Sequence, residues 1–215
     1  MNCFPIPLIP IEQNYTNMNY LAHAYLSFEN NETLTGNLIS DFVKGKKQFD
    51  YPAGIQKGIT LHRAIDTFTD SHPATHHAKT IFRAAYRLYA GAFVDVVFDH
   101  FLADDEQHFT DESLKEFASN TYTALESFSA YFPERFAAMF PYMKKQNWLY
   151  HYRSKWGIEK SMGGVVRRSA YLNESDTAYA LFQEHYKELK TCYLDFFPEL
   201  HTFAQEQYHR VHLTS

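Results

Sequence analysis

The stretch FVDVVFDHFLA, residues 93–103, decides the fold class of this chain. When it is wound as a helix, its Phe, Val and Leu side chains point in nearly every direction. A helix that is apolar all round lies in the middle of a bundle, because every face must be buried against a neighbour. Strand-like alternation of apolar and polar residues is nearly absent elsewhere, and only 8 Gly and 8 Pro serve 215 residues. The sequence therefore predicts an all-α, single-domain, multi-helix bundle.

Helix signals continue on both sides of this stretch. A short apolar helix is predicted over residues 18–28. The next helix is expected to begin with Asn31 or Thr33 as its cap and to end at Gly45. Pro52 lies in the first turn of a further helix, where its missing N–H has no helical partner to lose. Similar patterns run to about residue 209, so the helical domain is predicted to span residues 18–210.

The first 17 residues, MNCFPIPLIPIEQNYTN, differ in composition from the rest. Three prolines interrupt their apolar run, and no basic residue precedes it, which makes a poor signal peptide. We predict that residues 1–17 form a weakly ordered N-terminal extension outside the domain.

The bulk composition argues against several functions. A net charge of −5 argues against general nucleic-acid binding. No apolar run reaches the roughly 18 residues that a membrane span needs. Two cysteines, Cys3 and Cys192, cannot build a disulfide framework, so a reducing, cytoplasmic location is predicted. The sequence leaves the oligomeric state open.

The segment GITLHRAIDTFTD, residues 58–70, carries the first chemical signal. Side chains four residues apart share one face of a helix, which brings His62 and Asp66 together. An imidazole and a carboxylate one turn apart at the edge of a core form half of a metal site. A simple His–Asp hydrogen bond or a helix-end salt bridge explains the pair equally well.

The apolar helix over 93–103 adds Asp99, with His100 beside it. An unpaired buried carboxylate is costly, so such a group is paired, hydrogen-bonded or bound to a metal. Hydrogen bonds from a neighbouring helix are the alternative for Asp99 alone. Because His62 and Asp66 are also available, we predict that Asp99 binds the metal.

Two more segments supply candidates. GNLISDFVKGK, residues 36–46, contains Asn37 and, four residues later, Asp41 as a third carboxylate. MNYLAHAYLSF, residues 18–28, places His23 among apolar neighbours, where a satisfied core histidine is as good an explanation as a ligand.

Imidazole and carboxylate ligands without a thiolate suit Mn²⁺, Fe²⁺, Zn²⁺ or Mg²⁺. A cation of this kind activates water and neutralises the charge of a phosphate, which predicts phosphodiester hydrolysis. Arg63, next to His62, is a candidate contact for the phosphate, although an exposed salt bridge explains an Arg equally well.

The ordered set MNYLAHAYLSF, GNLISDFVKGK, GITLHRAIDTFTDSHP and DVVFDHFLA resembles the acyl carrier protein phosphodiesterase family, which is itself distantly similar to HD-domain phosphohydrolases. The resemblance implies an HD-like helical fold. It also implies a Mn²⁺-dependent hydrolase that removes 4′-phosphopantetheine from holo acyl carrier protein. Catalytic and metal-binding roles would then fall on the matching positions Asp41, His62, Asp66 and Asp99, with His23 and His100 as further ligands.

Acyl carrier protein is acidic, so its enzyme is expected to show it a basic surface. Candidate cations are Lys44, Lys46, Lys47 and Lys57, and the pair Arg167 and Arg168, although a solvated helix end explains such runs equally well. Two other functions stay open at this point. One is an HD-like phosphohydrolase that acts on a nucleotide, and the other is a non-enzymatic helical protein with a buried polar network.

Overall fold

The computed structural model describes residues 19–213, which fold into helices joined by short turns. No strand occurs in this range, which confirms the all-α prediction. The α-helices are α1 (Tyr20–Tyr25), α2 (Asn31–Ile39), α3 (Ala53–Ser71), α4 (Pro73–Tyr86), α5 (Ala90–Ala103), α6 (Asp111–Ser127), α7 (Glu134–Lys145), α8 (Trp148–His151), α9 (Lys155–Arg168), α10 (Asp176–Glu184) and α11 (Tyr186–Leu213). Short 3-10 helices occur at η1 (Ser40–Phe42), η2 (Gly45–Asp50), η3 (Arg87–Tyr89) and η4 (Ser129–Tyr131).

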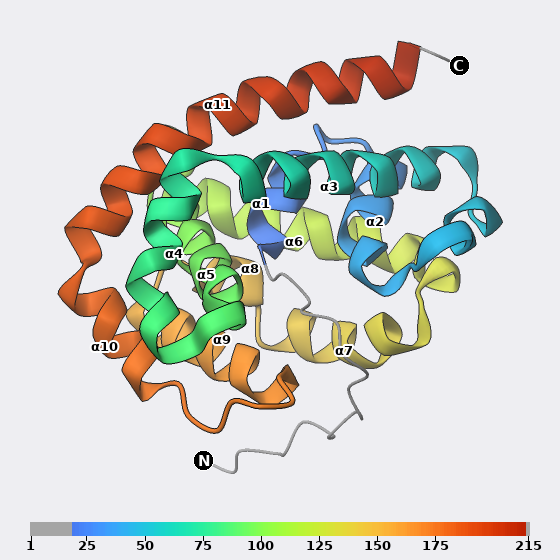
Figure 1. The fold of residues 1–215 in the computed structure, drawn as a ribbon. Coiled ribbons are helices and arrows are strands. Elements are labelled where there is room, and N and C mark those ends of the chain that lie inside the picture. The colour runs from blue at the N-terminus through green and yellow to red at the C-terminus, as the bar shows by residue number, and fades with distance from the viewer. Residues whose placement is uncertain (1–18, 214–215) are drawn as a thin grey trace.

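Helix α5 occupies the interior of the bundle, as its sequence predicts. All of its residues except Gly91 are buried. It contacts α1, α4, α9 and α11, which between them cover its apolar faces. The long helix α11 runs along the outside of the molecule against α3 and α4 (Figure 1). This arrangement buries the two acidic side chains of α5, Asp95 and Asp99, in the core.

Helix ends differ from the predicted ones where a side chain caps the backbone. Asn30, rather than Asn31 or Thr33, caps α2, because its side chain accepts a hydrogen bond from the Thr33 N–H. Helix α2 also ends at Ile39, before the predicted Gly45, and tightens into η1. The tighter turn places Asp41 beside α3.

Helices α2 and α3 cross with their backbones in contact at two glycines. A Cβ atom on Gly36 would overlap the Ile55 carbonyl of α3, and one on Gly58 would overlap the Thr33 carbonyl of α2. Glycine is therefore required at both positions for this close approach. The crossing brings Asn37 of α2 and His62 of α3 into one region of the core.

The predicted N-terminal extension, residues 1–17, lies outside the described part of the chain. Within residues 19–213, no helix is long and apolar enough to cross a bilayer.

Candidate metal centre

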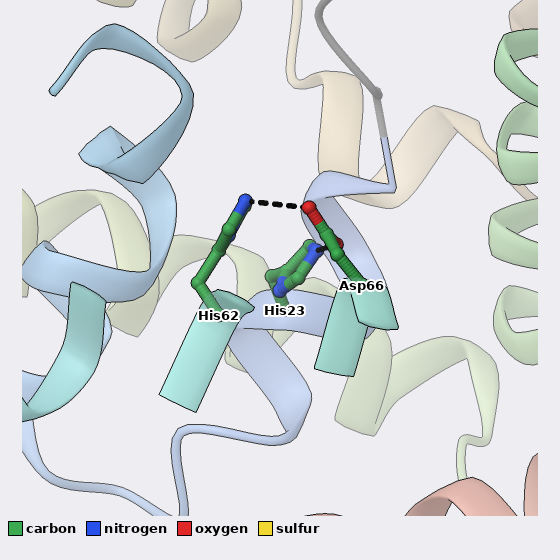
Figure 2. Close-up of side chains that lie close together, drawn as sticks. All are labelled: His23, His62 and Asp66. Atoms are coloured by element: carbon green, nitrogen blue, oxygen red, sulfur yellow. Dashed lines mark ion pairs between the residues drawn. The ribbon is translucent and has the colours of Figure 1, made fainter. Parts of the chain in front are cut away.

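Three side chains from two helices converge beside the α2–α3 crossing (Figure 2). His23 comes from α1, and His62 and Asp66 come from α3, with all three donor atoms within 4.8 Å of one another. The Nε2 atom of His23 lies 3.2 Å from Asp66 Oδ1, and Nε2 of His62 lies 3.1 Å from Asp66 Oδ2. The predicted pairing of His62 with Asp66 is therefore present, and the structure brings His23 to it.

The two imidazole rings are stacked, with centroids 4.1 Å apart and planes inclined by 18°. Asp41 of η1 adds a second carboxylate, with Oδ1 at 3.3 Å from His62 Nε2. The His side chains are only 3% and 5% exposed, whereas Asp41 and Asp66 are 17% and 23% exposed. The group therefore opens to solvent on its carboxylate side.

Asn37 fixes the orientation of the His23 ring. The Nδ2 group of Asn37 donates to the His23 carbonyl at 2.9 Å and to Ser27 Oγ at 3.1 Å, which leaves its Oδ1 as an acceptor. That oxygen lies 2.6 Å from His23 Nδ1, so Nδ1 carries the proton and donates it. The Nε2 lone pair of His23 is then directed at Asp66.

This arrangement leaves two hydrogen-bond acceptors facing each other. His23 Nε2 and Asp66 Oδ1 are both buried and have no hydrogen-bond partner within residues 19–213. Two lone pairs at 3.2 Å repel each other unless a cation lies between them. A second hydrogen bond to the far nitrogen is also the usual support of a metal-binding histidine. The chemistry of these donors therefore fits a divalent metal.

The charges around the group favour a cation as well. Burial, together with the neighbouring His62, lowers the pKa of His23, which keeps this ring neutral. Burial alone would lower the pKa of His62, but the carboxylates of Asp66 and Asp41 outweigh it and raise that pKa to about 10. For Asp66, burial opposes ionisation, yet His62 and His23 hold its pKa well below the usual range. Without a metal, a proton on His62 supplies the positive charge that the carboxylates require.

The structure does not bring Asp99 to this group. Its two oxygens accept the backbone N–H groups of Leu21 and Ala22, each at 2.9 Å, in the first turn of α1. Those N–H groups have no partner within a helix, so the buried carboxylate of α5 holds the start of α1. Asp99 thus fixes the helix that carries His23, and the hydrogen-bonding alternative describes it better than the predicted metal ligation.

His100 is also directed elsewhere. Its Nδ1 lies 2.7 Å from the Tyr152 carbonyl, and its Nε2 lies 3.4 Å from the Tyr186 hydroxyl. Burial lowers its pKa, as expected for a neutral core histidine. The structure therefore gives His100 a hydrogen-bonding role in the core and no contact with the three-residue group.

Arg63 makes its hydrogen bonds with the segment that follows Asp41. Its guanidinium donates to the Val43 carbonyl at 3.1 Å and to the Gln48 side chain. These bonds tie η2 and the segment before it to α3. Lys44, Lys46 and Lys47 lie in this tied segment, where they are exposed.

Comparison with known proteins supports the resemblance in the sequence. Residues 18–200 match the model of the acyl carrier protein phosphodiesterase family. Proteins named acyl carrier protein phosphodiesterase are similar over 88% of this chain. The protein from Photorhabdus laumondii is 30% identical, and the match covers 96% of that protein. The protein from Yersinia pestis is 32% identical, and the match covers 99% of that protein. That of Klebsiella pneumoniae is 33% identical, again over 88% of this chain and 99% of its own. No solved structure matches the chain, so the HD-like part of the fold prediction stays a prediction. On this evidence the chain belongs to the acyl carrier protein phosphodiesterase family, a family of hydrolases.

Proposed function

We propose that this protein hydrolyses the phosphodiester that joins 4′-phosphopantetheine to the serine of holo acyl carrier protein, and so releases the apo protein. The observation that carries the proposal is the pair of opposed lone pairs on His23 and Asp66, in a chain of this family. A mixed imidazole and carboxylate group suits a hard or borderline cation, and Mn²⁺ is the one we propose.

His23, His62 and Asp66 would hold the cation, and Asp41 is positioned to join them. A bound divalent cation supplies a site that lowers the pKa of water and neutralises the negative charge of the phosphodiester. Asp41 and Asp66 form the solvent-facing side, so we propose that the substrate enters over them. Asn37 keeps the proton of His23 on Nδ1, and Asp99 holds α1 in place.

We propose that Lys44, Lys46 and Lys47 receive the acidic carrier protein. They are exposed and lie three to six residues after Asp41, so a carrier protein held by them would present its prosthetic group near the carboxylates. Complementary charges speed and orient such encounters.

The direct test is mass spectrometry of holo acyl carrier protein after incubation with the Mn²⁺-loaded protein. We expect the carrier protein to lose the mass of phosphopantetheine. Asp66→Ala should abolish this loss and the bound metal. Asp70→Ala, one turn further along the same helix and paired with Lys79 on the surface at 2.7 Å, should change neither. Turnover of a nucleotide with no loss from the carrier protein would favour a nucleotide phosphohydrolase instead. Undiminished metal content in Asp66→Ala would contradict the metal site.

The docking surface has a separate test. Reversal of Lys44, Lys46 and Lys47 to Glu should weaken turnover of the carrier protein and spare a small phosphodiester such as bis(p-nitrophenyl) phosphate. An equal loss on both substrates would reject a docking role for these lysines.

A further inference from the structure

The 3-10 helix η2 turns one of its faces toward α3 and leaves the rest in solvent. A 3-10 helix has about three residues per turn, so side chains three residues apart share a face. Gln48 accepts a hydrogen bond from Arg63 and so marks the face that lies against α3. Lys46 and Phe49 share another face of η2, and both side chains are exposed. Phe49 therefore stands on the outer surface, with a cation one turn before it.

The aromatic ring of Phe49 is 64% exposed to water. A single exposed apolar side chain is common on protein surfaces, so its exposure alone assigns no role to it. Its surroundings are more informative, because the same short segment exposes Lys44, Lys46 and Lys47 and carries only one acidic residue, Asp50. Protein interfaces combine an apolar or aromatic centre with a polar rim. A rim of lysines around a phenylalanine suits an acidic protein partner.

The segment that carries Phe49 is tied to the helix of the candidate metal centre. Arg63 donates to the Val43 carbonyl at 3.1 Å and to the side chain of Gln48, which lie on either side of the first lysines. Arg63 follows His62 directly on α3, and Asp41, two residues before Val43, lies 3.3 Å from His62. These contacts fix the turn before any partner arrives. A preordered surface loses less conformational entropy on binding.

We propose that Phe49 is the apolar anchor that acyl carrier protein buries when it docks on η2. This inference rests on the proposed function, because it takes the carrier protein as the partner. The lysines of the segment speed and orient the encounter with an acidic protein, whereas a buried aromatic side chain supplies most of the affinity. Because η2 is tied to α3, a carrier protein anchored at Phe49 is held against the helix that carries His62 and Asp66.

The experiment compares Phe49→Ala with Leu88→Ala. Leu88 is a matched control because it is also exposed, at 77%, and also lies in a 3-10 helix, η3, which joins α4 to α5. We expect Phe49→Ala to lower kcat/KM for holo acyl carrier protein by about 30-fold, the effect of truncating an anchor residue in an interface. The small substrate bis(p-nitrophenyl) phosphate has no protein surface to dock, so its rate should not fall. Leu88→Ala should match wild type on both substrates.

A second readout measures docking without turnover. Apo acyl carrier protein has no prosthetic group to lose, so calorimetry can follow its binding to the Mn²⁺-loaded protein. Phe49→Ala should weaken this binding by about 30-fold. The Debye length falls from about 30 Å at 0.01 M salt to about 10 Å at 0.1 M. The loss caused by Lys46→Met should therefore shrink between these ionic strengths, whereas the loss caused by Phe49→Ala should persist.

The outcomes separate this inference from the proposed function. If wild type binds the carrier protein through Phe49 but releases no phosphopantetheine, the anchor stands and the proposed function fails. If wild type is active and Phe49→Ala matches Leu88→Ala in turnover and binding, the anchor is overturned. An equal loss on both substrates, a loss that vanishes with salt, or no binding of the carrier protein by wild type would also overturn it.

Discussion

Substitution of Asn37 by Leu tests whether the metal centre depends on the orientation of His23. The two side chains have the same number of heavy atoms and the same branching, so the change removes hydrogen bonds without opening a cavity. Three bonds are lost: from His23 Nδ1 to Asn37 Oδ1 at 2.6 Å, and from Asn37 Nδ2 to the His23 carbonyl at 2.9 Å and to Ser27 Oγ at 3.1 Å. The buried Nδ1–H of His23 is left without an acceptor.

The magnitudes follow from these bonds. An unsatisfied buried donor costs about 1–3 kcal/mol, and each further hydrogen bond lost costs about 1 kcal/mol. We therefore expect Asn37→Leu to destabilise the metal-free fold by about 3–5 kcal/mol. Loss of the bond that orients a ligand should also weaken metal affinity by about 10–100-fold. Urea unfolding of the chelated protein measures the first effect, and competition with a fluorescent chelator measures the second.

Ser27→Ala is the matched control. It removes one acceptor of Asn37 and the Ser27 hydroxyl that donates to the His23 carbonyl at 2.7 Å, but it keeps the bond to His23 Nδ1. It should cost about 2 kcal/mol in stability, about 1 for each bond, and leave metal affinity nearly unchanged. If Asn37→Leu binds Mn²⁺ as tightly as Ser27→Ala does, the assignment of the His23 proton to Nδ1 is refuted.

Three further predictions concern the same framework. The folded-state pKa of His62 is about 10, above its unfolded value. The stabilisation that protonated His62 gives the metal-free protein is therefore complete below about pH 6.5 and is lost as the pH rises through about 10. Urea titrations should show this decline in the free energy of unfolding, and His62→Asn should flatten it. Gly58→Ala should destabilise the fold by about 3 kcal/mol or more, because the new methyl group meets the backbone of α2. Gly163→Ala, whose Cβ approaches the flexible end of Arg167 at 3.3 Å, should be neutral or stabilising by about 0.5–1 kcal/mol, and thermal melts of the two variants measure both effects. Asp99→Asn should cost about 2 kcal/mol in urea unfolding, because its amide nitrogen would face a backbone N–H of α1, and no loss would show that the carboxylate does not hold that helix.

The sequence predicts the helices of the bundle better than their ends. The interior position of α5 follows from its residues alone, because a helix that is apolar on every side has few other places to lie. The end of α2 at Ile39 does not follow from the local sequence. There the chain changes to a 3-10 turn in which Asp41 contacts His62 of α3, 21 residues away along the chain. Local signals do not record such a contact.

The candidate metal centre is predictable to the same extent. His62 and Asp66 share a helix, so their spacing brings them together in any fold that keeps that helix. His23 joins them only through the packing of α1, and sequence gives no way to separate it from Asp99, another buried polar residue in an apolar segment. Asp99 meets backbone N–H groups of α1, whereas His23 meets His62 and Asp66. This difference depends on how the helices pack and is not visible in the local sequence. The role of Asn37 is hidden for the same reason.

The glycine crossing of α2 and α3 also bears on how this protein can change over generations. Where two helices meet through side chains, a substitution on one is absorbed by a small shift of the other, and such shifts accumulate. Here backbone meets backbone at Gly36 and Gly58, so neither helix can move closer without a clash. Substitutions in the more distant helices can then alter the surface that meets a partner without changing the separation between Asn37 and His62. The crossing therefore allows the surface that meets a partner to vary while the geometry of the candidate metal centre stays the same.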